Sequence, residues 1–158
     1  MKLLFSVCLF VLITQISWAQ NVEIQNNLVK IDKKKWSILE KKGCETPEDF
    51  CAYIFYDLKK KDFLIAANVF TYHQPATIDN PQSNEIFYYL NLSFNGFERT
   101  AEIDFSNQNM AAVIALLHQE KLIVNGKLNA EQVQQFIKKE GTKYSDKNPS
   151  VLILKEAN

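Results

Sequence analysis

The chain has 158 residues and is electrically balanced, with 18 basic and 18 acidic side chains. This balance excludes a global electrostatic attraction to nucleic acid or to a membrane. Arg99 is the sole arginine. Because arginine is the residue that usually recognises phosphate groups, its scarcity also argues against a nucleic-acid-binding module.

The first residues are typical of a secretory signal peptide. Lys2 supplies a positive charge, residues 3–13 form an almost unbroken apolar run, and Ala19 ends a stretch with small residues where cleavage is expected. The run is shorter than the roughly 20 residues that a membrane-spanning helix needs, so an uncleaved anchor is the weaker alternative. We therefore expect residues 1–19 to be removed and residues 20–158 to form a single globular domain, exported to the periplasm or secreted.

Two cysteines, Cys44 and Cys51, remain after the expected cleavage. An even number of cysteines in an exported chain indicates a disulfide bond. Their spacing is not the CxxC of a redox enzyme, so we expect a structural bond that closes a short loop. Residues 46–49, within this loop, carry a helix-start signal and predict a single helical turn.

Apolar and polar residues alternate through the first half of the domain, which predicts β-strands. An Asn26-Asn27 turn and a polar break at residues 32–35 separate the first three strands. Two longer strands follow with apolar residues on both faces, which is typical of the centre of a sheet. A surface loop follows at residues 74–84. The predicted strands are residues 22–24, 29–31, 36–38, 51–56 and 63–72.

Asn95 and Gly96 lie between two alternating runs and predict a β-hairpin with a two-residue type I′ turn. This register places Leu90 opposite Ala101, on the face that we expect to be core. The other face is expected to be largely wet, and its aromatic residues would need to be covered by a helix or a partner. It carries Phe87, Tyr89, Asn91, Ser93, Glu98, Thr100, Glu102 and Asp104.

After residue 105 the apolar period changes from that of a strand to that of a helix. The spacing predicts a first helix over residues 110–117, capped by Ser106 or Asn107. A short extended piece at residues 121–128 follows and contains a second Asn-Gly turn.

A second helix is predicted to begin after Asn129, its cap, and to end at Gly141. The tail from about residue 142 is polar, and the apolar residues 151–154 could add an edge strand. Strands followed by helices predict an α+β fold, an antiparallel β-meander of about six or seven strands with two C-terminal helices packed on the sheet.

The stretch AAVIALLHQEKLIVNGKLNAEQVQQFIKKEG, at residues 111–141, follows a meander that contains a GC…C segment. In this combination the chain resembles a group of small exported bacterial proteins that have a signal peptide, a β-meander and two C-terminal helices. The resemblance covers most of the domain. It implies no assigned activity and brings no catalytic residues.

Candidate chemistry is sparse. Residues 20–158 contain no familiar catalytic or metal-binding motif, and the chain has two histidines, His73 and His118, so a zinc site with several histidines is excluded. We expect neither a metal nor a cofactor. Glu102 and Asp104 alternate onto one face with Cβ atoms roughly 6–7 Å apart, a separation that suits hydrolysis or calcium binding, although such acids also serve solubility. His118 is expected to be a packed helix-terminal residue.

Two ends of the meander are candidate interaction surfaces, because successive turns alternate between them. The lysines at 33–35 and 59–61 fall at one end, which could meet lipid headgroups or polysaccharide. The cystine loop and the loop at 74–84 fall at the other, with Tyr72 and His73 at its base. We favour this second end, because a stiffened loop lowers the ordering cost of recognition and an aromatic residue offers an anchor.

The sequence therefore predicts a non-enzymatic exported module that binds a protein, an envelope component or a small amphiphile, with no catalytic residue. Two alternatives stay open. One is a small hydrolase or glycan-active enzyme that uses Glu102, Asp104 or His73. The other is a carrier with an amphiphile cavity between the sheet and the helices. Neither a nucleic-acid partner nor a transmembrane segment after cleavage is expected.

Overall fold

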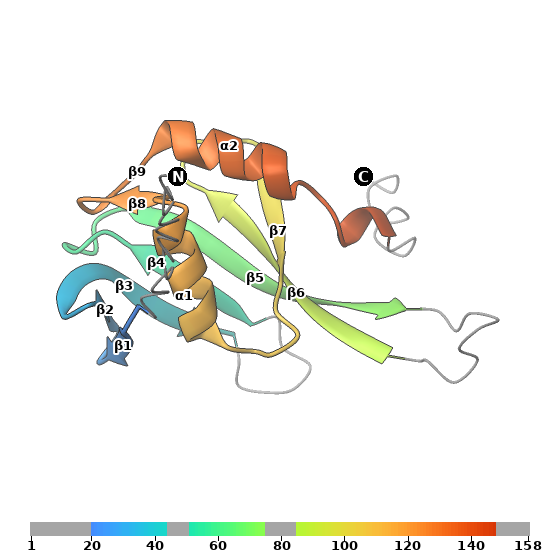
Figure 1. The fold of residues 1–158 in the computed structure, drawn as a ribbon, viewed down its shortest axis with the longest axis horizontal. Coiled ribbons are helices and arrows are strands. Elements are labelled where there is room, and N and C mark those ends of the chain that lie inside the picture. Colours follow the sequence, from blue (N-terminus) through green and yellow to red (C-terminus); the bar gives the residue numbers. More distant parts are fainter. Residues whose placement is uncertain (1–19, 44–50, 75–84, 148–158) are drawn as a thin grey trace, which may run out of the picture.

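The computed structural model describes residues 20–43, 51–74 and 85–147. They form a seven-stranded sheet in which the strand order follows the chain and each neighbouring pair is antiparallel. Two helices follow and lie on one face of the sheet (Figure 1), which confirms the predicted α+β fold. The strands are β1 (Val22–Gln25), β2 (Leu28–Ile31), β3 (Lys34–Lys42), β4 (Ala52–Tyr56), β5 (Phe63–Gln74), β6 (Glu85–Phe94) and β7 (Thr100–Asp104).

Both helices, α1 (Met110–Gln119) and α2 (Ala130–Glu140), bury their apolar stripes against this face. A short hairpin of β8 (Ile123–Val124) and β9 (Lys127–Leu128) connects them, and a 3₁₀ turn, η1 (Ser145–Lys147), follows α2. Each fully buried large apolar side chain contributes about 1.5–3 kcal/mol. Those contributed by the helices and by β6 are Ile114, Leu117, Val133, Phe136, Leu90 and Leu92.

The predicted cap of α2 is confirmed and that of α1 is wrong. Asn129 caps α2, where its side chain accepts a hydrogen bond from the backbone of Gln132. At α1 the cap is Asn109 and not Ser106 or Asn107. An extra turn precedes the helix, because the backbone N–H of Gln108 donates to the carbonyl of Phe105 and Gln108 has a φ of 47°. A residue in that left-handed conformation cannot be part of an α-helix.

The tight turns at the other hairpins follow the expected chemistry. A type I′ turn requires positive φ at both central residues, which Asn and Gly adopt most easily. Asn125 and Gly126, between β8 and β9, have φ of 52° and 73°. Two further pairs, with φ of 50° and 66° in each, connect the first three strands at Asn26-Asn27 and Asp32-Lys33.

The hairpin of β6 and β7 differs from its prediction. Leu90 lies opposite Ile103, a shift of two residues from the expected register. The turn is not type I′, because Gly96 has a φ of 83° while Asn95 is not among the described residues with positive φ. A shift of two residues preserves the alternation, so the side chains still lie on the expected faces.

The cause of the shift is the attachment of Asn95 to the neighbouring strand. Its backbone N–H donates to the carbonyl of Leu64 at 3.0 Å, and its side chain donates to the carbonyl of Phe63 at 2.9 Å. Phe97 then folds back and its ring packs edge-on against Phe94, with centroids 6.5 Å apart. The chain therefore reaches Thr100 before pairing resumes.

Some predictions concern residues outside the described ranges: the signal peptide, Cys44, the helical turn at 46–49, residues 75–84 and the edge strand at 151–154. Cys51 lies directly before β4, and its carbonyl accepts a hydrogen bond from Val69 at 2.9 Å. The disulfide between the two cysteines stays a prediction. Among the described residues no helix is long and apolar enough to cross a membrane.

Candidate functional site

β5 and β6 extend beyond the strands on either side of them. β4 pairs with β5 as far as Asn68, and β7 pairs with β6 as far as Tyr89. Beyond these points residues 71–74 and 85–88 pair with each other. Tyr88 still packs against the core, and the two strands then project from the body (Figure 1). We call these two segments the ribbon. An isolated two-stranded ribbon is at best marginally stable in water, so its side chains have to support it.

Five aromatic rings pack together at the base of the ribbon, on the sheet face opposite the one where Leu90 and Leu92 are buried beneath the helices. Phe70 lies opposite Tyr89 with ring centroids 5.6 Å apart, and Tyr72 lies opposite Phe87 with centroids 5.3 Å apart. Both pairs are stacked with an interplanar angle of 25°. Cross-strand aromatic pairs of this kind stabilise a sheet beyond the burial of their area. With Tyr144, these residues form what we call the aromatic cluster.

Tyr144 reaches the cluster from the segment that follows α2. Its ring stacks on Tyr89 with centroids 5.2 Å apart and is tilted against Tyr72 at 6.1 Å. Tyr89 is thereby 2% exposed. Burial raises the pKa of Tyr89, and the charge of Glu102 adds to this effect. Burial likewise raises the pKa of Tyr144, and the charge of Asp104 is its next cause.

Glu102 holds this segment in place. One carboxylate oxygen accepts hydrogen bonds from the backbone N–H groups of Tyr144 and Ser145, at 2.8 and 2.9 Å. The other accepts from the side chain of Asn91 at 3.3 Å. The backbone N–H of Glu102 donates to the carbonyl of Gly141 at 2.8 Å. Hydrogen bonds to an ionised carboxylate are the strong ones, which explains how a charged side chain can be fully buried here.

The prediction that this sheet face is largely wet is therefore wrong at Tyr89 and Glu102, which are both buried. The cover is neither of the two helices, which lie on the opposite face. It is the C-terminal segment that crosses the edge of β7.

The three residues of the hydrolase alternative do not meet in one site. Glu102 and Asp104 lie on the same face, as predicted, but Asp104 is exposed and accepts hydrogen bonds from the backbone and hydroxyl of Ser106. His73 pairs with Ile86 in the ladder, whereas Glu102 pairs with Asn91. These positions are five residues apart along β6, about 16 Å at the rise of a strand.

His118 is at the end of α1, where it was expected. Its ring lies edge-on to Trp36 with centroids 6.1 Å apart, and its Nδ1 is 3.2 Å from the side-chain oxygen of Gln20. Over residues 20–43, 51–74 and 85–147, no group of three or more His, Cys, Asp or Glu side chains is arranged to hold a metal ion.

A groove of about 990 Å³ lies between the β6–β7 connection and α2. Half-buried Phe97 and Ile137 line it together with the exposed cations Arg99 and Lys138. It lies outside the interface between sheet and helices, where core side chains such as Ile114 are fully buried.

Comparison of the chain with known proteins finds no matching family model, no matching curated relative and no matching solved structure.

The sequence predicted Tyr72 and His73 as site residues at the end of the sheet that carries the ribbon. It did not indicate the role of Tyr144 in the aromatic cluster. The tail was predicted to be polar, yet it carries one aromatic residue four positions after the end of α2. An isolated aromatic residue in a polar segment is the signal that could have indicated a docked tail, because burial of a large aromatic ring stabilises the contact that covers it.

Proposed function

We propose that this chain is a non-enzymatic exported module that binds a protein partner through the ribbon and its aromatic cluster. The observation that carries the proposal is the projection of a two-stranded ribbon whose base is a stack of aromatic rings. Tyrosine and other aromatic residues dominate the energetics of protein interfaces. The predicted signal peptide and disulfide support a role outside the cytoplasm.

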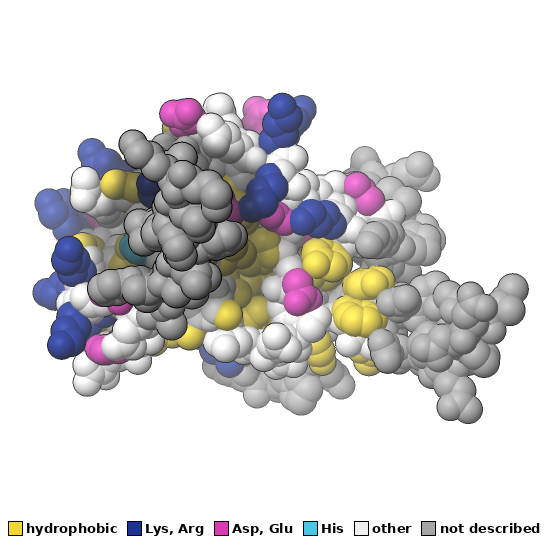
Figure 2. Space-filling view, viewed as in Figure 1, with side chains coloured by type: hydrophobic (Ala, Val, Ile, Leu, Met, Phe, Trp, Pro, Cys, Tyr) yellow, Lys and Arg dark blue, Asp and Glu magenta, His cyan; other side chains and the backbone are white. Residues whose placement is uncertain are grey.

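Apolar side chains lie on both faces of the ribbon. Ile86, on the helix side, is 52% exposed, the largest exposed fraction among the exposed large hydrophobic residues described. Phe87 and Tyr72, on the other side, are half-buried and stacked. Figure 2 shows apolar side chains gathered where the two strands leave the body. Contiguous exposed apolar surface in a soluble protein marks an interaction site.

The base of the ribbon is already ordered before any partner arrives. Glu102 fixes the backbone of Tyr144, and the ring of Tyr144 fixes Tyr89. A surface that is rigid in the free protein has less conformational entropy to lose on binding. This arrangement therefore supports recognition by a preformed surface.

The hydrolase alternative has less support, because the carboxylate of Glu102 already accepts three hydrogen bonds within the chain. The groove beside α2 supports the carrier as a second candidate. Its apolar residues Phe97 and Ile137 could accept the chain of an amphiphile whose anionic head meets Arg99 or Lys138. Displacement of a fluorescent fatty acid from the exported protein, lost in Ile137→Ser, would test this candidate.

The ribbon is tested by capturing its partner where the protein is exported. A photo-reactive amino acid at position 86 should cross-link a protein that the same group at position 24 does not. Ile24 is the matched control, because it is an exposed isoleucine of another strand with an exposed fraction of 47%. Ile86→Asp should then weaken binding of the captured protein by about tenfold or more, and Ile24→Asp should leave it unchanged.

A second pair of variants compares the two ends of the sheet. One replaces Tyr72 and His73 with alanine, and the other replaces the lysines at 33–35 and 59–61 with glutamine. Loss of partner binding in the lysine variant alone would show that the wrong end was chosen. Binding that survives in both variants would contradict both surfaces.

A further inference from the structure

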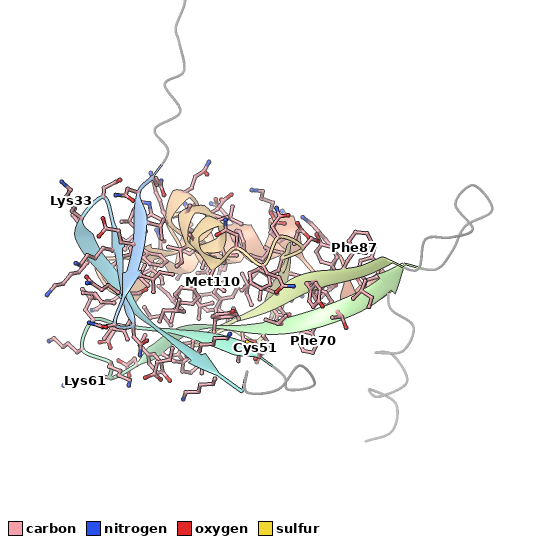
Figure 3. The ribbon with its side chains drawn as sticks, turned by 90° about the horizontal axis from the view of Figure 1, so that it is seen from below. Lys33, Cys51, Lys61, Phe70, Phe87 and Met110 are labelled. Atoms are coloured by element: carbon pink, nitrogen blue, oxygen red, sulfur yellow. The ribbon has the colours of Figure 1, made fainter. Side chains whose placement is uncertain are left out.

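The end of the molecule opposite the ribbon gathers lysine side chains from three separate turns. Lys33 and Lys61 lie at this end in Figure 3, and Figure 2 shows the lysines of the same region beside β8 and β9. The β8–β9 turn is brought against the β4–β5 connection, since Lys127 and Asp57 line one depression. We call this region the basic end. Its lysines, all exposed, are Lys33, Lys34, Lys35, Lys59, Lys60, Lys61 and Lys127.

Carboxylates on the same segments do not neutralise these charges. Glu40 forms an ion pair with Lys60. Asp57 is engaged by the turn itself, where it accepts hydrogen bonds from the backbone of Lys61 and Asp62. With Asp32 and Asp62, four carboxylates stand against seven lysines, so the basic end has an excess of positive charge although the whole chain is balanced.

Exposed apolar side chains lie among these lysines. Leu58 and Phe63, on the β4–β5 connection and the start of β5, are 42% and 41% exposed. Val124, next to the β8–β9 turn, is 44% exposed. They are three of the five large hydrophobic residues that are exposed in the described part of the chain. Single exposed apolar residues are common on protein surfaces, but three at one end of the molecule form a patch of the kind that marks an interaction site.

We propose that the basic end docks on the surface of an anionic phospholipid bilayer. Lysines near such a surface each strengthen binding by about fivefold through attraction to the headgroups. Apolar side chains at the tips of turns insert at the boundary between headgroups and acyl chains. A polyanionic polysaccharide would satisfy the lysines but offers no apolar layer for Leu58, Phe63 and Val124, so the combination favours lipid.

This docking does not depend on the proposed role of the ribbon. It does define how the molecule would be oriented on a bilayer, because the basic end and the ribbon lie at opposite ends of the long strands β5 and β6 (Figure 3). A molecule bound through the basic end would direct the aromatic cluster away from the bilayer.

Residues 20–158 should sediment with vesicles of phosphatidylcholine and phosphatidylglycerol and not with vesicles of phosphatidylcholine alone. Lys33→Gln with Lys59→Gln should lower the partition coefficient by about tenfold or more. Lys41→Gln with Lys143→Gln is the charge-matched control and should change it much less, because these exposed lysines lie outside the basic end. Raising the salt concentration should weaken binding of the parent protein.

The apolar contribution separates a bilayer from other anionic partners. Leu58→Ser with Val124→Ser should reduce vesicle binding by about fivefold or more, while Ile24→Ser should not. Circular dichroism checks that each variant is folded. Equal sedimentation with both kinds of vesicle, or equal loss in the two lysine pairs, would overturn the proposal. So would binding to dextran sulfate that matches vesicle binding and is insensitive to the two serines.

Discussion

The two faces of the sheet are made by the same alternating strands but are closed in different ways. On one face, α1 and α2 cover a continuous set of buried apolar side chains, among them Leu90 and Leu92. On the other face the described chain contributes a single short segment, which places Tyr144 on Tyr89. The first face is covered through burial of a large apolar area. The cover of the second face is held by hydrogen bonds to one carboxylate, that of Glu102.

This difference separates what stabilises the fold from what presents a surface. Burial on the helix side scales with apolar area and belongs to the fold as a whole. The docked tail on the other side depends on few contacts, and regions of this kind open at lower free energy than the core. The aromatic cluster can therefore be altered with less effect on folding, which makes the comparison testable by substitution.

The largest expected effect is on the helix side. Leu90→Ala should lower the free energy of unfolding by about 2–5 kcal/mol, because it leaves a cavity in the packed core. Leu90 is fully buried. Thr100→Ala, at a half-buried position of the other face, should cost less than about 1 kcal/mol. Urea unfolding of both variants measures the difference, and equal losses would mean that the faces are assigned wrongly.

The next effect concerns the carboxylate that closes the other face. Glu102→Ala should cost about 2–4 kcal/mol, because the backbone N–H groups of Tyr144 and Ser145 lose their acceptor. Amide exchange at these two residues should become faster. Asp104→Ala is the control on the same strand face, and should cost less than about 1 kcal/mol because Asp104 is exposed. Unchanged exchange at 144 and 145 would show that Glu102 does not hold the tail.

The helix side was predictable from sequence, and the other side was predictable only in part. Alternating apolar residues in strands and apolar residues at helical spacing indicate which side chains are buried. These patterns therefore placed Leu90 on the core face of the sheet and Val113 on the inner side of α1. The register of the β6–β7 hairpin was not recoverable from the Asn-Gly pair. It depends on hydrogen bonds from Asn95 to β5, which is distant in sequence.

The candidate site shows the same limit. Tyr72 was recognised as the aromatic residue at the root of a long loop, and the structure places it in the aromatic cluster. Glu102 has the sequence surroundings of an exposed acid on an alternating strand. Its burial results from a segment about 40 residues later in the chain, and no local pattern carries that information.

A smaller effect is expected from the ring that covers the cluster. Tyr144→Ala should lower the free energy of unfolding by about 1–2 kcal/mol, because two aromatic contacts are lost from a half-buried position. Tyr144→Phe keeps the ring and should be close to neutral. Near-ultraviolet circular dichroism should report the loss of stacking in the alanine variant. A phenylalanine variant as unstable as the alanine variant would show that the hydroxyl, and not the stack, matters.

The smallest effect on stability, and the most specific to this face, comes from raising the pH. Burial raises the pKa of both Tyr89 and Tyr144 in the folded protein. A raised pKa means that the folded state holds these protons more tightly than the unfolded chain, in which tyrosine ionises near about 10. The stabilisation is therefore fully present below about pH 10 and is lost as the pH rises through the raised pKa values.

Absorbance at the tyrosinate band measures this effect and should show late-titrating phenols among the six tyrosines of the chain. Tyr89→Phe and Tyr144→Phe should each remove one late component, and in urea all tyrosines should titrate together. If both variants keep the full late component, Tyr89 and Tyr144 are not the shielded phenols of the second face.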